Sequence, residues 1–114
     1  MTRDDILALY REIAEESGLP VKGKKTAYTA TGGNMWSFLD ADGVLCLRLS
    51  DAGRTEWAQD FPDDPVLQYG SVMRGYVAVP PEMLADRELL AAWFARAAAH
   101  GASLKPKTTK KTQG

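Results

Sequence analysis

The segment VLCLRLS, residues 44–50, restricts the fold of this chain more strongly than any other stretch. Leucines at every second position alternate with Val44, Cys46 and Arg48. In a β-strand this alternation sends the leucines to one face and the mixed set to the other. The pattern is typical of an antiparallel sheet that is covered on one side only. We therefore expect helices elsewhere in the chain to bury the leucine face.

Two further β-prone runs precede this strand, TAYTAT at residues 26–31 and MWSFLD at residues 35–40. The three runs are separated by GGN and DADG, which have the glycine and the Asp or Asn that tight hairpin turns require. DADG also resembles the start of a calcium loop, but the later ligands and the closing glutamate are missing. The three runs therefore predict an antiparallel meander.

Helical segments flank the meander on both sides. Thr2 and Ser50 are the predicted N-caps of the first two helices. Asp86 is expected to cap a second segment within the third helix, and Gly101 predicts the end of that helix. The predicted helices cover residues 3–17, 51–60 and 81–101.

The stretch VLQYGSVMRGYVAVP, residues 66–80, holds two apolar runs that Gly70 and Gly75 interrupt. We expect two antiparallel strands, with the glycines allowing the chain to turn between them. The predicted order of elements is then α-β-β-β-α-β-β-α. The expected fold is α+β, with two layers and a five-stranded antiparallel sheet packed against helices.

The chain has 114 residues and suits one domain, predicted over residues 1–103. Residues 104–114 are expected to form a disordered basic tail, because they show no apolar periodicity. Residues 101–114 hold four lysines and no acidic residue. The first hundred residues hold ten Lys or Arg against fifteen Asp or Glu, so an acidic body precedes a basic tail.

A cytoplasmic location is expected from three features of the sequence. No apolar run approaches the roughly 18 residues that a transmembrane helix needs. The N-terminus is acidic and amphipathic, whereas a signal peptide begins with basic residues followed by an apolar segment. Cys46 is the single cysteine, so the chain forms no internal disulfide, which fits a reducing compartment.

No catalytic, cofactor-binding or metal-binding residue is predicted, and we expect that the protein is not an enzyme. His100 is the only histidine and lies in the last turn of a predicted helix, so it has no second histidine as a metal partner. Cys46 lies in the middle of an apolar strand, where a buried, inert thiol is expected. Arg48 shares its strand face, so a reactive thiol stays open as an alternative. The TGGN segment is not followed by the GKS or GKT of a phosphate-binding loop.

Two regions are candidates for a partner surface. Trp36 alternates with Met35 and shares its direction with Phe38, so it can lie on the less covered face of the sheet. Arg74 and Tyr76 lie beside the turn in the stretch 66–80 and can present a second surface. The alternative is that residues 66–80 form only a bend between two strands, without a partner contact.

Lysines give the chain a second candidate function, which is weak nucleic-acid binding without sequence specificity. Such binding would depend on phosphate contacts and would be lost with added salt. The alternative is a solvated, solubilising tail, since no aromatic stacking pattern accompanies these lysines. The candidate contacts are Lys22, Lys24, Lys25, Lys105, Lys107, Lys110 and Lys111.

The sequence resembles the N-terminal domain of the TfoX/Sxy family over about residues 3–107. MWSFLDADGVLCLRLS is similar to the central hairpin of the family, and MRGYVAVPPEML is similar to its Met-Lys/Arg-Gly-Tyr-Val-x-Val-Pro segment. DRELLAAWFARAAAHGASLKPK is similar to its closing helix and basic exit. The family commonly carries a Met-Phe-Gly-Gly run in its first strand, and only Gly32 and Gly33 correspond to it here.

The resemblance implies a small two-layer domain of the kind seen in secretion-chaperone-like folds. It implies a non-enzymatic interaction or regulatory domain that contacts a protein partner or a second copy of itself. Larger members of the family are associated with the regulation of natural competence. The family supplies no established catalytic residues and no cofactor, and neither a membrane nor a small-molecule substrate is expected as a partner.

Overall fold

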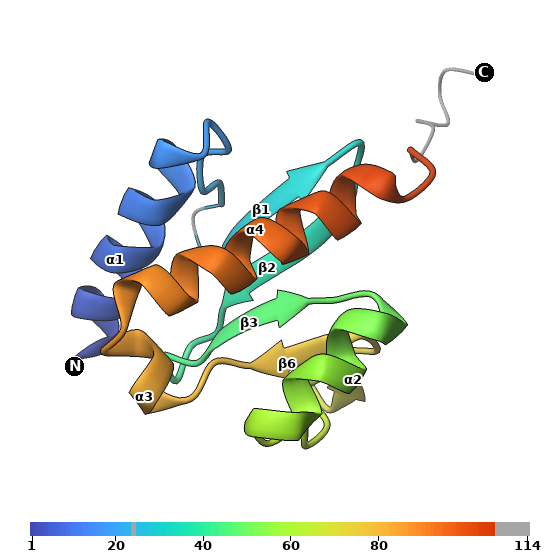
Figure 1. The fold of residues 1–114 in the computed structure, drawn as a ribbon. Helices are drawn as coiled ribbons and strands as arrows, with labels where there is room; N and C mark the ends of the chain where they lie inside the picture. The colour runs from blue at the N-terminus through green and yellow to red at the C-terminus, as the bar shows by residue number, and fades with distance from the viewer. Residues whose placement is uncertain (24, 107–114) are drawn as a thin grey trace.

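Four strands form one antiparallel sheet in the order β1-β2-β3-β6 in the computed structural model, which describes residues 1–23 and 25–106 (Figure 1). Helices pack against this sheet, so the chain has the predicted α+β class. The elements are α1 (Arg3–Glu16), β1 (Ala27–Thr31), β2 (Asn34–Leu39), β3 (Leu45–Arg48), α2 (Asp51–Asp60), β4 (Leu67–Gln68), β5 (Ser71–Val72), β6 (Tyr76–Ala78), α3 (Pro81–Leu84) and α4 (Arg87–Ser103).

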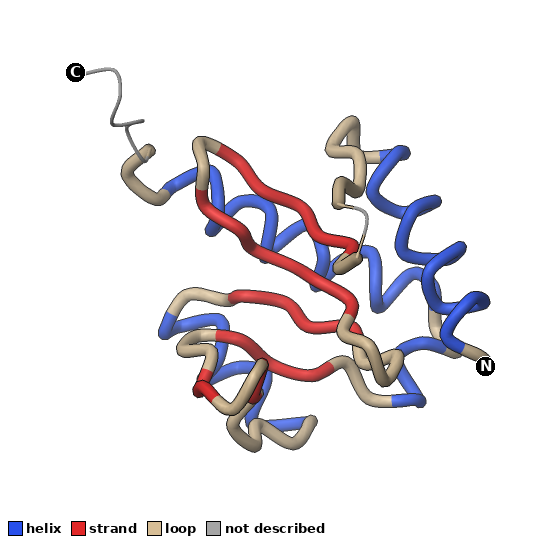
Figure 2. The backbone as a smooth tube through the Cα atoms, turned by 180° about the vertical axis from the view of Figure 1, so that it is seen from behind, coloured by secondary structure: helices blue, strands red, loops and turns tan. Residues whose placement is uncertain are grey.

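The predicted five-stranded sheet is wrong, because the stretch 66–80 contributes three short strands and only one of them joins the main sheet. β6 pairs with β3, whereas β4 and β5 pair only with each other in a separate hairpin. In the view from behind, the segment between α2 and β6 lies in front of β6 and apart from the long strands (Figure 2). Alternating apolar residues predict strands at this place, but they do not determine which sheet the strands enter.

The leucine face of β3 is buried under helices, as the alternation predicts. Leu45, Leu47 and Leu49 are at most 3% exposed and belong to the main core, together with apolar residues of α1, α2 and α4. α4 lies across β1 and β2, and α1 packs at its side (Figure 1). Cys46, on the opposite face of β3, is also buried, at 1% exposed. The expectation that one face stays uncovered is therefore wrong.

Trp36 lies on the helix-covered face, so the prediction that it shares a face with Phe38 is wrong. The pairing of β1 with β2 shifts register between Thr29 and Ala30, because Thr29 pairs with Ser37 and Ala30 with Met35. Trp36 is thus the extra residue of a β-bulge. The bulge sends Trp36 and Ser37 to the same side of the sheet, and Trp36 is fully buried there.

Gly101 lies inside α4 and does not end it, because the helix continues to Ser103. An added Cβ at Gly101 would lie only 2.4 Å from Cδ1 of Trp36. The indole therefore packs directly against the helix backbone, and any larger residue at position 101 would collide with it. The contact joins the end of α4 to the middle of β2.

The predicted helix starts are confirmed by their caps. Thr2 and Asp5 form a capping box at the start of α1, and the Ser50 hydroxyl accepts a hydrogen bond from the Gly53 amide in α2. Asp86 separates α3 from α4 and accepts a hydrogen bond from the Leu89 amide. Each cap satisfies an amide at a helix start that the helix itself leaves without a partner.

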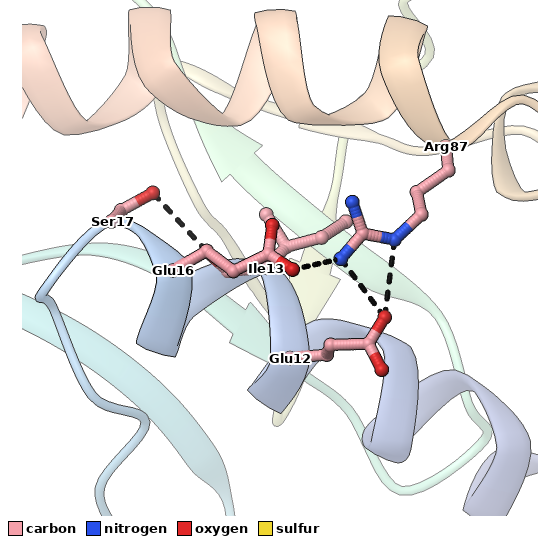
Figure 3. Close-up of polar contacts among 5 residues, drawn as sticks. All are labelled: Glu12, Ile13, Glu16, Ser17 and Arg87. Carbon is pink, nitrogen blue, oxygen red and sulfur yellow. Dashed lines mark hydrogen bonds and ion pairs between the residues drawn. The ribbon is translucent and has the colours of Figure 1, made fainter.

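An ion-pair cluster at the surface joins α1 to the start of α4 (Figure 3). Arg87 donates to one Glu12 oxygen from Nε at 3.1 Å and from Nη2 at 2.9 Å. Nη2 also donates to Glu16 at 2.6 Å. The Arg87 side chain is 41% exposed and those of Glu12 and Glu16 are 61% and 60% exposed, so the cluster joins the two helices at the surface and adds little to stability.

Within residues 1–23 and 25–106, no helix combines the length and the apolar character needed to cross a bilayer. Of the predicted basic tail, residues 104–106 are described. Asn34 donates a hydrogen bond to the Lys105 carbonyl at 3.0 Å, so this part of the tail lies against the β1–β2 turn. Residues 107–114 lie outside the described residues.

Candidate functional site

The hairpin between α2 and β6 is the first feature of the candidate site. Leu67 pairs with Val72, and Gln68 pairs with Ser71, across a two-residue turn. Tyr69 and Gly70 both have positive φ, at 52° and 80°, as the two central residues of a type I′ turn require. Glycine adopts this conformation easily, whereas a tyrosine there is uncommon.

The apolar side chains of this hairpin face solvent. Leu67 and Val72 are each 58% exposed, and Tyr69 at the tip is 90% exposed. With Met1, they are the large apolar side chains that the described part of the chain leaves exposed. Leu67 and Val72 are cross-strand partners, so they form one continuous apolar surface with no further layer above it.

The base of the hairpin is fixed to the sheet. The Met73 amide donates to the Val66 carbonyl at 2.8 Å, which closes the hairpin below its paired strands. Val66 is buried, and both residues pack into a second apolar cluster that includes Phe38 and Cys46. The exposed tip therefore projects from an anchored base.

Of the three residues predicted to form a partner surface, Arg74 alone is exposed. Trp36 is fully buried, as described above, and Tyr76 is 7% exposed. The Tyr76 hydroxyl donates to the Met35 carbonyl at 2.8 Å, and burial raises the pKa of Tyr76 to about 12. Tyr76 thus anchors β6 to β2 as a neutral phenol, while Arg74 lies at the surface beside the hairpin.

A cleft of about 590 Å³ opens next to the hairpin. It lies between the end of β3, the start of α2, the hairpin segment and the end of α4. Val66, Val72 and Met73 line it from the hairpin segment, so the cleft and the exposed apolar surface share Val72. Its charged or titratable lining residues are Arg48, Asp51, Arg54, Asp63, Arg74 and His100.

The arginines of this cleft have no carboxylate partner among the described residues. The ion pairs in that part of the chain involve Arg87 and Arg96, and none involves Arg48, Arg54 or Arg74. The Nε atom of Arg54 is buried and has no hydrogen-bond acceptor within residues 1–23 and 25–106. Because an unpaired buried donor is costly, Arg54 is suited to receive an acceptor from a bound group.

His100 reaches this cleft from the last turn of α4. Burial lowers the pKa of His100, the positive charge of Arg48 lowers it further, and Asp51 raises it. The sequence places His100 correctly near the end of a helix, but it gives no indication that the imidazole lies near Arg48, 52 positions earlier in the chain. The neutral imidazole is therefore favoured at neutral pH.

Cys46 is not among the residues that line this cleft. It lines a separate hollow with Asp40 and Asp64, whereas Arg48, two residues along the same strand, lines the cleft. Burial, with a smaller contribution from the charge of Asp40, raises the pKa of the thiol to about 12. The thiolate is the reactive form of cysteine, so Cys46 is an inert thiol at neutral pH.

The DADG segment is a hairpin turn, as predicted. One carboxylate oxygen of Asp40 accepts from the amides of Asp42 and Val44 at 2.9 and 2.8 Å. That oxygen is therefore occupied by the backbone of its own turn. In the described ranges, no group of three or more His, Cys, Asp or Glu residues is arranged to hold a metal ion.

The predicted nucleic-acid contacts do not gather into one surface in the described part of the chain. The backbone of Lys22 pairs with Tyr28, toward the start of β1, whereas Lys105 lies against the turn at the other end of that strand. Lys25 is exposed near the start of β1. The other candidate contacts, which are Lys24, Lys107, Lys110 and Lys111, lie outside the described residues.

A scan of the chain against models of protein families finds no match, and a search among curated proteins finds no relative. The candidate site consequently depends on geometry alone. It consists of the exposed hairpin tip and the arginine-lined cleft beside it.

Proposed function

We propose that the chain is a non-enzymatic interaction domain that binds a partner protein through the β4–β5 hairpin. The observation that supports this function is the exposure of Leu67, Tyr69 and Val72 on an anchored, projecting hairpin. A continuous apolar surface of this kind is unfavourable in water and becomes favourable when a partner covers it. Aromatic residues such as tyrosine are enriched in protein interfaces.

The same proposal includes membership of the TfoX/Sxy family, in its N-terminal domain. The MRGYVAVP segment that carries the resemblance forms β6 and the turn before it, directly after the hairpin. A layer of helices on one face of an antiparallel sheet agrees with the small two-layer, secretion-chaperone-like domain that the family would imply. Cys46 supports a non-enzymatic role, since burial suppresses its thiolate form. A free cysteine also agrees with the cytoplasm as its location.

Site-specific photo-crosslinking in native cells tests the hairpin contact. A photoreactive phenylalanine replaces Tyr69, which is 90% exposed, and a matched control replaces Ala92, an exposed residue on α4. We expect one discrete adduct from position 69 and none of the same mass from position 92. An adduct of twice the mass of the chain identifies a second copy as the partner.

The variant Leu67→Ser/Val72→Ser serves as the specificity control for this adduct. Removing the apolar surface beside position 69 is expected to abolish the adduct, because apolar burial provides most of the affinity in such a contact. Identical adducts from positions 69 and 92, or an adduct that survives the double substitution, would contradict the proposal.

A further inference from the structure

The cleft beside the hairpin has the size and the lining of a small-molecule site. Its volume of about 590 Å³ lies within the roughly 300–1,000 Å³ of typical ligand pockets. Leu49, Val66 and Met73 give it apolar walls. Polar groups that converge between apolar walls are the usual composition of such sites, and here the polar groups are mostly charged.

Two of the three arginines of the cleft lie at one end. Arg48 and Arg74 line a smaller hollow at that end together with Met35, Val72, Met73 and Tyr76, and none of these residues is acidic. Leu49 donates its amide to the Gly75 carbonyl at 2.9 Å, and the Arg48 side chain lies against Gly75. This contact places Arg48 against Gly75, the residue that follows Arg74, and both arginines line the hollow.

Asp51 and Asp63, the acidic residues of the cleft, line a second hollow with Arg54, Thr55 and Ala58. Asp51 also faces His100, as Arg48 does, but neither carboxylate lines the Arg48–Arg74 hollow. The Arg48–Arg74 end thus carries two positive charges without a carboxylate among its lining residues. A ligand that carries two negative charges on one group would neutralise both of these arginines.

We propose that this cleft binds a phosphate monoester, with Arg48 and Arg74 holding the phosphate group. A phosphate monoester carries a charge of about −1.5 to −2 at neutral pH, whereas a carboxylate carries only one charge. The guanidinium group donates two parallel hydrogen bonds to phosphate oxygens. The apolar body of the ligand lies against Val66 and Met73, and the buried Nε of Arg54 donates to an acceptor farther along it.

Proton NMR of His100 tests the proposal directly, because the single imidazole gives one unambiguous set of signals. The probe is phenyl phosphate, which joins a dianionic group to an apolar ring. We expect a saturable shift of the His100 signals and a rise in the pKa of His100, since bound negative charge offsets the effect of Arg48. Absence of a saturable shift would overturn the proposal.

Matched substitutions locate the phosphate group. Arg48→Gln and Arg74→Gln are each expected to weaken binding roughly tenfold or more, because each removes at least one charge-assisted hydrogen bond to the phosphate. Arg11→Gln, at an exposed position on α1, removes the same charge away from the cleft and is expected to leave binding unchanged. Equal weakening in all three variants would show general charge attraction and overturn the assignment. Arg74 is exposed, so Arg74→Gln keeps the fold even if Arg48→Gln does not.

Two further probes define the ligand chemistry. Benzenesulfonate has the same ring and only one charge, and we expect it to bind roughly tenfold more weakly than phenyl phosphate. Equal affinity for the two probes would contradict a site for a dianion. A short phosphotyrosyl peptide that binds more tightly than phenyl phosphate would identify a phosphorylated side chain as the source, and weaker binding would identify a free small molecule. The hairpin adduct at position 69 does not require Arg48, so the two proposals fail independently.

Discussion

The two faces of the sheet are buried by different means. On one face, eighteen buried residues form the main core with apolar side chains from α1, α2 and α4. On the other face, four buried residues form a small cluster that the segment between α2 and β6 covers. That segment contains only two strands of two residues each. Helices cover the first face, and a short hairpin covers the second.

Because of this difference, the two faces open at different free energies. A large, interlocked core opens only when the whole domain unfolds, whereas a segment with few buried side chains opens at a lower free energy. The hairpin covers this second face, and the cleft opens at its edge, between the hairpin segment, the start of α2 and the end of α4. Residues that bind a partner or a ligand are expected on the part of a domain that can move without unfolding it.

The largest expected effect compares two phenylalanines on opposite faces. Phe94 and Phe38 are each 1% exposed. Phe94 projects from α4 and packs between Tyr10 and Trp36 in the main core, whereas Phe38 packs against Tyr76 beneath the hairpin segment. We expect Phe94→Ala to lower the free energy of unfolding by about 5 kcal/mol and Phe38→Ala by about 3 kcal/mol. The difference arises because the short hairpin segment can move into the space that the removed Phe38 ring leaves, whereas the packed helices cannot fill the space left by Phe94.

Urea unfolding of the two alanine variants measures this difference, with wild-type protein as reference. Hydrogen exchange supplies the control, because Phe38→Ala should speed exchange at the Met73 amide far more than at amides within β2 and β3. Equal losses of stability in the two variants would contradict the comparison between the faces.

Gly101→Ala is expected to give the next largest effect. The added methyl group would meet Trp36 at 2.4 Å, so the helix or the indole must move. We expect a loss of about 1–3 kcal/mol by thermal or urea unfolding, although alanine is intrinsically the better helix former. Gly53→Ala in α2 is the comparison variant, since its added methyl group would meet Leu49 at 3.3 Å, which is a close contact but no collision. A Gly101→Ala variant that is more stable than wild type would contradict the close packing of Trp36 against the backbone of α4.

The smallest expected effect is the pH dependence that His100 contributes. Burial and Arg48 lower its pKa in the folded state below the usual 6.5. As the pH falls through about 6.5, the unfolded chain takes up the proton first, so the folded state loses stability. We expect the stability difference between wild type and His100→Gln to shift against wild type below this pH. A difference that stays constant between pH 7 and about pH 5 would contradict the position of His100 near Arg48.

The regular parts of the fold could be predicted from local signals. Alternation in residues 44–50 indicates β3 and its buried leucine face, and short polar residues indicate the helix caps. The bulge at Trp36 could not be predicted in this way. It depends on the contact between that indole and the backbone of Gly101, 65 positions away in the chain. The alternation rule assumes a strand without a bulge, so it places Trp36 on the face opposite to the one on which it lies.

The candidate site was harder to predict than the fold. Arg74 could be singled out because it follows a turn, but Arg48, Arg54 and His100 reach the cleft from β3, α2 and α4. No fixed spacing joins these positions, so no motif indicates them. The alternation in residues 66–80 predicts two strands of the main sheet, but a separate hairpin forms, and the exposure of Tyr69 and its neighbours follows from that separation.

The measurement that tests the central claim most directly is urea unfolding of Leu67→Ser/Tyr69→Asn/Val72→Ser. Asparagine keeps the positive φ of the turn, and serine removes the apolar groups. If the exposed hairpin side chains serve binding and not folding, the free energy of unfolding stays within about 1 kcal/mol of wild type. A loss of about 3 kcal/mol or more would place these side chains in the stabilising core and contradict the separation of the two faces.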